Sequence, residues 1–142
     1  MNRSQLLRFL QGNSLAVEVS NSLTGAPQAA VVGIVVSRHF EVFFDTVESS
    51  RKVYNLRRNP NIAFVIGGLA DSNERTVQYE GVADEPTGAD LRRLQELYFR
   101  SFPDGRERAA WPGIVYVRAR PRWIRYSDYN QDPPTIREFT FG

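Results

Sequence analysis

The sequence contains no cysteine and a single histidine, His39. The first absence excludes disulfide bonds, thiolate metal sites and cysteine nucleophiles, and the second argues against a multi-histidine metal site or a Ser-His-Asp triad. No apolar run approaches the roughly 18 residues that a membrane span needs, and residues 1–12 lack the apolar block of a signal peptide. We therefore expect a cytoplasmic protein with no membrane partner.

The chain also has little net charge, because 18 basic residues stand against 16 acidic ones and leave a balance of +2. That balance is too small to argue for nucleic acid. Arg118, Arg120, Arg122 and Arg125 alternate along predicted strands, which is typical of a solvated face. A phosphate or substrate mouth and an RNA surface are the alternatives, and the RNA reading lacks aromatics at a stacking spacing. We expect no nucleic-acid partner.

Length and composition are those of a globular domain: 142 residues, 42% hydrophobic, 12% aromatic and 24% charged. A chain of this size buries roughly 70% of the surface that its unfolded form exposes, so it can fold without a metal or a disulfide. No internal repeat and no linker divides it. We expect one domain over residues 1–142.

Hydrophobic periodicity predicts short helices and a larger number of strands. The expected helices cover residues 3–10, with Ser4 as a possible cap, 49–58, and 87–99, where Thr87 and Asp90 have capping-box spacing. The expected strands cover 15–20, 29–36, 40–46, 62–66, 76–83, 114–119 and 122–127, with Pro121 separating the last two, and residues 135–141 could add another. The valine-rich run 29–36 is typical of a strand buried on both faces.

Tight turns join the early strands, at 23–27 and 37–39, so these strands should pair antiparallel. A loop is expected at 67–68 and 71–73. No βαβ alternation is visible. The pattern therefore predicts a mainly β (α+β) fold: an antiparallel barrel of six to seven strands with about three flanking helices.

One segment carries the residues best suited to bind a ligand. A strand ends at Thr46, and a helix begins near Ser49-Ser50-Arg51-Lys52. The first turn of a helix presents unpaired N–H groups and a partial positive charge, and here it adds two hydroxyls and two cations. Arginine can fork to two phosphate oxygens and lysine acts as a point charge. The alternative is a serine cap followed by surface cations.

The same segment resembles the FMN-binding signature of the pyridoxamine 5'-phosphate oxidase-like split-barrel family. The matching residues are Thr46, Ser50, Arg51, Lys52, Leu56, Asn59 and Pro60. A second stretch, Glu74-Arg75-Thr76 to Glu80-Gly81, resembles the family strand that faces the flavin. The resemblance covers about residues 12–127 and implies an antiparallel split β-barrel, with FMN as cofactor.

By this resemblance, Arg51 and Lys52 would hold the FMN phosphate, with Ser50 assisting. Thr46 and the backbone near Val47 would contact the ring system, and Ala30, Val31 and Val32 would line the flavin edge. Thr76 stands where the oxidases usually have a glutamine that bonds the flavin. The family also builds each pocket from two subunits, which implies a homodimer with the flavin at its interface.

Three departures separate this sequence from the oxidases themselves. Asp45 stands at an aromatic position of the family, Phe102 replaces the arginine that binds the substrate phosphate, and no Arg-x-His-Asp-Arg motif follows Trp123. A phenyl ring cannot pair with a phosphate dianion. We therefore expect a divergent relative that keeps the flavin, has lost the vitamin B6 substrate site and does not oxidise pyridoxine phosphate.

Several function classes stay open at this point. The protein would be an FMN-dependent oxidoreductase using NAD(P)H or another small-molecule substrate, a non-catalytic flavin-binding or stress-related module, or a deazaflavin-dependent reductase. Because the cofactor supplies the redox chemistry, the scarcity of histidine and cysteine is no objection to the first. His39 is expected to be exposed without a role. Trp111 is expected to pack locally or to cover a partner's flavin, and Trp123 and Tyr126 to lie in the core or an interface.

Overall fold

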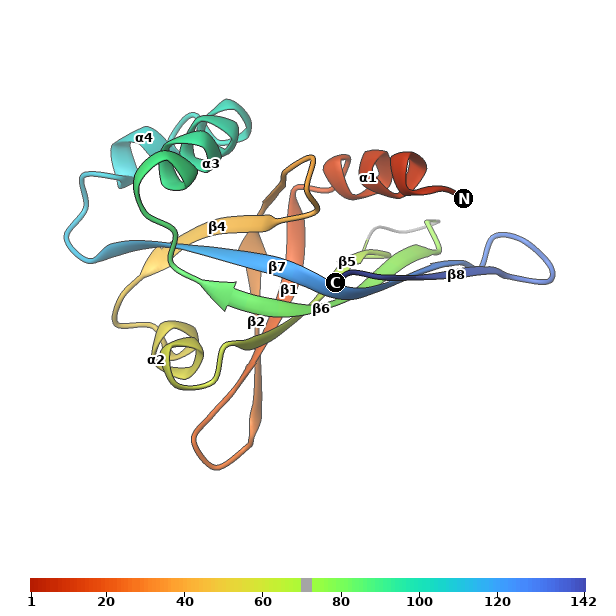
Figure 1. Cartoon of the computed structure of the whole chain (residues 1–142), viewed down its shortest axis with the longest axis horizontal. Coiled ribbons are helices and arrows are strands. Elements are labelled where there is room, and N and C mark those ends of the chain that lie inside the picture. Colours follow the sequence, from red (N-terminus) through yellow and green to blue (C-terminus); the bar gives the residue numbers. More distant parts are fainter. Residues whose placement is uncertain (70–72) are drawn as a thin grey trace.

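A computed structural model describes residues 1–69 and 73–142 and shows a strongly twisted antiparallel sheet with helices at its margins (Figure 1). In that part of the chain the strands are β1 Leu15–Asn21, β2 Pro27–Gly33, β3 Val35–Val36, β4 Val42–Val47, β5 Asn61–Gly67, β6 Arg75–Asp84, β7 Ile114–Asp128 and β8 Thr135–Thr140. The helices are α1 Arg3–Gln11, α2 Arg51–Arg58, α3 Gly88–Ser101 and α4 Gly105–Arg108. The expected loop residues 71 and 72 lie outside the described residues.

The strand order β2-β1-β5-β6-β7-β4-β3, with β8 added beside β7, is that of a half-open barrel. Strand β7 organises it, because residues 114–119 pair with β4, residues 123–128 pair with β8, and β6 pairs with residues 118–128 along the other edge. The predicted antiparallel split-barrel class is confirmed. The last strand that the tail pattern allowed is present as β8.

The predicted break at Pro121 is wrong, because Pro121 lies inside the continuous strand β7. The register between β6 and β7 shifts at Glu80/Gly81, opposite this proline. A bulge tolerates a residue without an N–H donor. A Cβ on Gly81 would overlap the carbonyl oxygen of Arg120, so the two strands approach closely only because residue 81 is glycine.

Other expectations need smaller corrections. The run 29–36 divides into β2 and β3, and β2 is not buried on both faces, since Val31 is 65% exposed. Helix α1 is capped by the side chain of Asn2 in a capping box, not by Ser4, and Thr87 makes no side-chain capping bond. The short helix α4 was not predicted. His39 is exposed, as expected.

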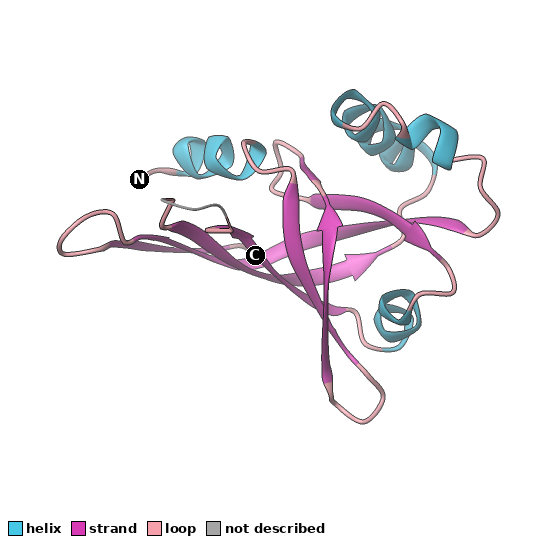
Figure 2. Cartoon of the chain, turned by 180° about the vertical axis from the view of Figure 1, so that it is seen from behind, coloured by secondary structure: helices cyan, strands magenta, loops and turns pink. Residues whose placement is uncertain are grey.

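The larger hydrophobic core fills the barrel under α1, and a second cluster lies between α3 and the sheet. Figure 2 shows α3 and α4 together at one margin, with α1 and α2 apart from them. The second cluster consists of Val35, Phe43, Leu94 and Tyr98. Helix α3 is therefore joined to β3 and β4 by apolar packing.

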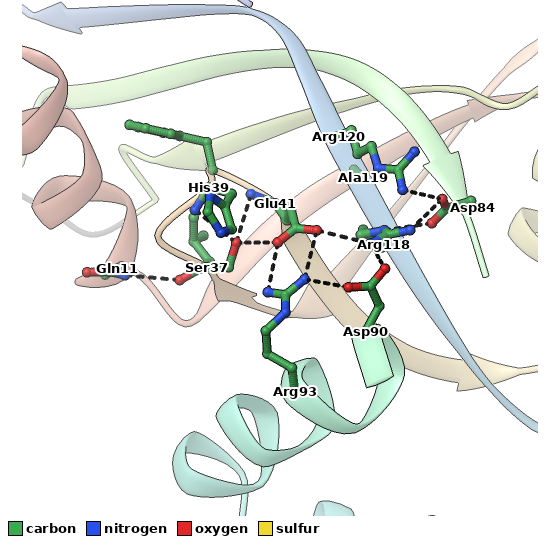
Figure 3. Close-up of polar contacts among 12 residues, drawn as sticks. Gln11, Ser37, His39, Glu41, Asp84, Asp90, Arg93, Arg118, Ala119 and Arg120 are labelled. Carbon is green, nitrogen blue, oxygen red and sulfur yellow. Dashed lines mark hydrogen bonds and ion pairs between the residues drawn. The ribbon is translucent and has the colours of Figure 1, made fainter. Parts of the chain in front are cut away.

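A buried ion network also fastens α3 to the sheet (Figure 3). The carboxylate of Glu41 accepts hydrogen bonds from Ser37 Oγ at 2.7 Å, from Arg93 Nη1 at 3.0 Å and from Arg118 Nη1 at 3.2 Å. The guanidinium of Arg118 also donates to both oxygens of Asp84, at 2.9 and 2.8 Å. Since Arg93 is on α3, Arg118 on β7 and Asp84 on β6, this network sets where β4 begins.

We predict that Glu41→Gln lowers stability by about 3 kcal/mol at pH 7, because it leaves part of the buried Arg118 charge uncompensated. Burial alone would raise the pKa of the Glu41 carboxyl, but hydrogen bonds from Arg93 and Ser37 and the charge of Arg93 lower it below its usual range. A lowered folded-state pKa contributes stability above about pH 4 that is lost as the pH falls through it. Urea unfolding should therefore show wild type and variant converging toward pH 3.

The matched control is Glu96→Gln, which changes an exposed glutamate on α3, the helix that carries Arg93. It should leave the free energy of unfolding within about 0.5 kcal/mol of wild type. A constant difference between wild type and Glu41→Gln from pH 7 to pH 3 would contradict the prediction.

Candidate functional site

The candidate site lies where β4 ends and α2 begins. Ser50 is the N-cap of α2, but its side chain makes no capping bond, and the first turn of the helix contains no acidic residue. Its hydroxyl instead lies 3.4 Å from Thr46 Oγ1. The first N–H groups of α2 and the Ser50 hydroxyl are therefore available to an anion.

Lys52 completes this corner from the first turn of α2. Its ammonium donates to Thr46 Oγ1 at 3.4 Å, and the side chain is half-buried, whereas that of Arg51 is exposed. The structure thus brings together Thr46, Ser50 and Lys52, as the sequence predicted, with Arg51 beside them. The corner is positively charged and carries two hydroxyls.

Two cavities adjoin the corner, and Arg51 lines both of them. The smaller, of about 100 Å³, lies between α2 and strands β1 and β2 and is also lined by Ala30 and Lys52. The larger, of about 410 Å³, extends from Ser50 toward the turn between β1 and β2. The smaller one has the scale of a single anionic group.

A hydrogen-bonded polar layer lies against both cavities. The side-chain amide of Asn55, which is buried on α2, donates to Ser20 Oγ at 3.1 Å and to Gln28 Oε1 at 2.9 Å. These bonds join α2 to β1 and β2. The start of α2 is therefore held at a set distance from the two strands.

Glu18 is a residue of this site that the sequence interpretation missed. It lies on β1, is 1% exposed and lines the smaller cavity with Arg51 and Lys52. Its Oε1 atom is buried without a hydrogen-bond partner. Burial raises the pKa of its carboxyl, while the charge of Lys52 and a hydrogen bond from Ser20 act in the opposite direction. No signal for it was present in the sequence, because the alternation over 15–20 favours Leu15, Val17 and Val19 for the inner face, whereas the structure buries Ala16, Glu18 and Ser20.

The residues expected to line the flavin edge do not share one face. Ala30 is paired with Glu18 and lies on the cavity side with the buried Val32, but Val31 points to the opposite side of the sheet. Val47, at the end of β4, is 39% exposed beside the corner. Of this group, Ala30 and Val47 adjoin the site, and Val31 belongs to the outer face.

Thr76 also lies away from the corner. It is near the start of β6, where its hydroxyl donates to the carbonyl of Gly67 at 3.5 Å. Strand β6 approaches α2 with its opposite end, at Ala83 and Asp84. The predicted site residues therefore form two groups on one chain, with Thr76 separate from Arg51 and Lys52.

Two of the three departures from the oxidase pattern, Asp45 and Phe102, lie in one packed cluster. Asp45 accepts from Tyr98 Oη at 3.0 Å and from Arg108 Nε at 2.9 Å, which ties α3 and α4 to β4. The ring of Phe102 stacks on Tyr98 with a centroid distance of 4.8 Å and covers Gly33. This region is filled by packed side chains, and Phe102 offers no group that could pair with an anion.

The described residues offer no alternative metal centre, since residues 1–69 and 73–142 contain no group of three or more His, Asp or Glu side chains placed to hold an ion. None of the helices in these ranges has the length and apolar character needed to cross a membrane. A further cavity of about 670 Å³ lies between α1, the start of β6 at Arg75 and the end of β7 at Asp128. Its most deeply buried charged group, Asp128, is already bonded to Asn130 and Gln131.

No protein-family profile and no curated protein matches the chain. Solved structures do. A heme binding protein from Mycobacterium smegmatis superposes with a TM-score of 0.83 at 14% identity, over 99% of this chain and 58% of the other. A putative pyridoxamine 5'-phosphate oxidase from Listeria innocua gives 0.68 at 16%, over 87% and 95%. A pyridoxamine 5'-phosphate oxidase-related, FMN binding protein from Nostoc punctiforme gives 0.69 at 9%, over 99% and 96%.

The chain therefore has the split-barrel fold of the pyridoxamine 5'-phosphate oxidase-related proteins, in a divergent form. The same fold is found in heme-binding proteins, and this chain spans little more than half the length of the one from Mycobacterium smegmatis. At these identities the likeness defines the fold, and the ligand has to be argued from the site.

Proposed function

We propose that the protein binds FMN and acts as an FMN-dependent oxidoreductase, with the FMN phosphate at the start of α2. The observation that carries the proposal is the meeting of Lys52, two hydroxyls and the free N–H groups of a helix N-terminus beside a cavity of about 100 Å³. The ammonium, the hydroxyls and the backbone N–H groups can each donate a hydrogen bond to a phosphate oxygen.

The roles follow from the chemistry of each side chain. Lys52 supplies a point charge that Thr46 holds in place, and Arg51 supplies a planar fork at the mouth of both cavities. Ser50 contributes its hydroxyl and the adjoining N–H groups. FMN, when bound, supplies the redox chemistry. No side chain of the corner is then required to act as an acid or base toward substrate.

The isoalloxazine ring would lie outside the barrel, against Ala30 and the end of β4 near Val47, and a second copy of the chain would cover it. A separate apolar row, on the side of β2 opposite Ala30, offers a second surface for contact between copies. Val17 of β1 pairs with Val31 of β2 on one side and with Val65 of β5 on the other, and Val31 and Val65 are 65% and 38% exposed. A two-fold axis would place the same row on both partners.

A dimer would also account for Thr76. On one chain it lies away from Arg51 and Lys52. We infer that a Thr76 from the second copy takes part in the same flavin site. Trp111, which is 56% exposed, is available to the same interface.

The absorption spectrum of the purified protein, with mass analysis of what heat releases, tests the cofactor. FMN gives the oxidised flavin bands and its own mass. A deazaflavin, a heme or no chromophore would each contradict the proposal. Oxidation of NAD(P)H by the FMN-loaded protein then distinguishes an oxidoreductase from a non-catalytic flavin-binding or stress-related module.

We predict that Lys52→Ala weakens FMN binding ten- to a hundredfold, because one charge-assisted phosphate contact contributes on the order of 1.5–3 kcal/mol. Fluorescence titration of FMN measures it. The matched control is Arg58→Ala, which removes a cation from the other end of α2, where Arg58 bonds the carbonyl of Tyr54. Unchanged affinity in the Arg51→Ala, Lys52→Ala double variant would place the phosphate elsewhere.

We predict that Val31→Glu converts the dimer to a monomer, because it buries a charge in an apolar contact. Light scattering at micromolar concentration gives the mass. Leu23→Glu is the control, since Leu23 is 71% exposed in the turn between β1 and β2. A wild-type monomer that still carries FMN would rule out the dimeric site.

A further inference from the structure

The buried carboxylate of Glu18 is the least satisfied polar group of the corner. Beside it, the amide of Asn55 donates hydrogen bonds to Ser20 and to Gln28. Glu18 Oε1 has no hydrogen-bond partner although the residue is 1% exposed and lines the smaller cavity. An unpartnered buried oxygen of this kind costs free energy unless a ligand or a proton satisfies it.

The charges around Glu18 are few. The cavity is lined from α2 by Arg51 and Lys52, from β1 by Ser20 and from β2 by Gln28, Ala29 and Ala30, and the β5 residue opposite Glu18 is Phe64. Among these, the cations of Arg51 and Lys52 are the charges that face the carboxyl. Of the two, Lys52 is half-buried and lowers its pKa, against the larger effect of burial.

A phosphate bound at Arg51 and Lys52 changes this balance. The two negative charges of the phosphate pair with the same cations, Arg51 and Lys52, that compensate the charge of Glu18. The phosphate and the Glu18 carboxylate are then two anions in one small cavity, and they repel each other. The repulsion is relieved if the carboxyl takes a proton. A neutral carboxyl then has an O–H to donate, whereas an ionised one can only accept.

We propose that Glu18 is the proton-holding residue of this anion site: binding of a phosphate monoester is coupled to uptake of one proton from solvent by Glu18, whose carboxyl then donates a hydrogen bond to the ligand. The inference rests on the proposed phosphate site at α2. Glu18 Oε1 gains the O–H bond, the proton comes from the buffer, and no other bond changes. The residue makes the site selective for phosphate-bearing ligands at lower pH.

The coupling has a measurable size. Between the pKa of Glu18 in the free protein and its higher value in the complex, the dissociation constant should rise up to tenfold for each unit of pH. Riboflavin, which lacks the phosphate, should show no such dependence. Glu18→Gln carries a neutral amide of the same shape. It should bind FMN with only the pH dependence of the ligand's own phosphate, and at least tenfold more tightly than wild type at the upper end of the range.

Titration calorimetry of FMN, from pH 5.5 to 9 in pairs of buffers with different ionisation enthalpies, counts the protons. The ligand's own phosphate titrates with a pKa of about 6, and Glu18→Gln supplies that baseline. We expect wild type to take up close to one proton per FMN beyond the baseline at its maximum. Glu48→Gln, which removes an exposed carboxylate next to the same helix, should keep the full uptake.

The outcomes separate the two proposals. If FMN binds and wild type takes up no proton beyond the Glu18→Gln baseline at any pH, the role of Glu18 is overturned and the phosphate site stands. If neither FMN nor inorganic phosphate binds, both are overturned. Circular dichroism checks that Glu18→Gln is folded and can serve as the baseline, and the riboflavin comparison, which is read on wild type, does not depend on that variant.

Discussion

The pairing of Glu41 with Arg118 inside the protein is the interaction on which the arrangement around it depends. Two charges are buried side by side, at 7% and 6% exposure, and each is compensated again by Arg93 or Asp84. Burying two ions has a desolvation cost, which is offset only where every partner lies within hydrogen-bonding distance. The positions of these partners therefore determine where the pair lies. That position fixes the start of β4 relative to α3, β6 and β7, and β4 in turn carries Thr46 to the start of α2.

At the other end of β4 the charges are arranged differently. Around Glu41 the carboxylate is bonded by Ser37 and both arginines, whereas Glu18 has Lys52 nearby and one oxygen without a partner. The first cluster is complete without any ligand, which explains why it holds the fold together. The second is incomplete, and it lies beside a cavity. This contrast is the physical reason for seeking the ligand at α2 and not in the more heavily charged network.

The barrel class and α2 could be predicted from local patterns of strands, turns and helix periodicity. The group Thr46, Ser50 and Lys52 could be predicted because these residues lie close together in the sequence. Local patterns failed where distant strands decide the outcome. Pro121 looked like a break because proline lacks an N–H, and only pairing with β6 at Gly81 makes it a bulge within β7. Val31 looked buried because it is apolar, and its side of β2 is uncovered in one chain. Glu18 became a candidate only once α2 was placed over β1.

The pairing of β4 with β7 joins residues 42–47 to residues 114–119, and such long-range contacts are slow to form during folding because a long loop must close first. The strand that carries Thr46 has no other long partner in the sheet, since β3 contributes only two residues. We therefore expect β4, which carries Thr46, to join the sheet late in folding. Hairpins β1–β2 and β5–β6 can form before that, and Thr46 reaches its place beside Ser50 and Lys52 only after β7 has been synthesised.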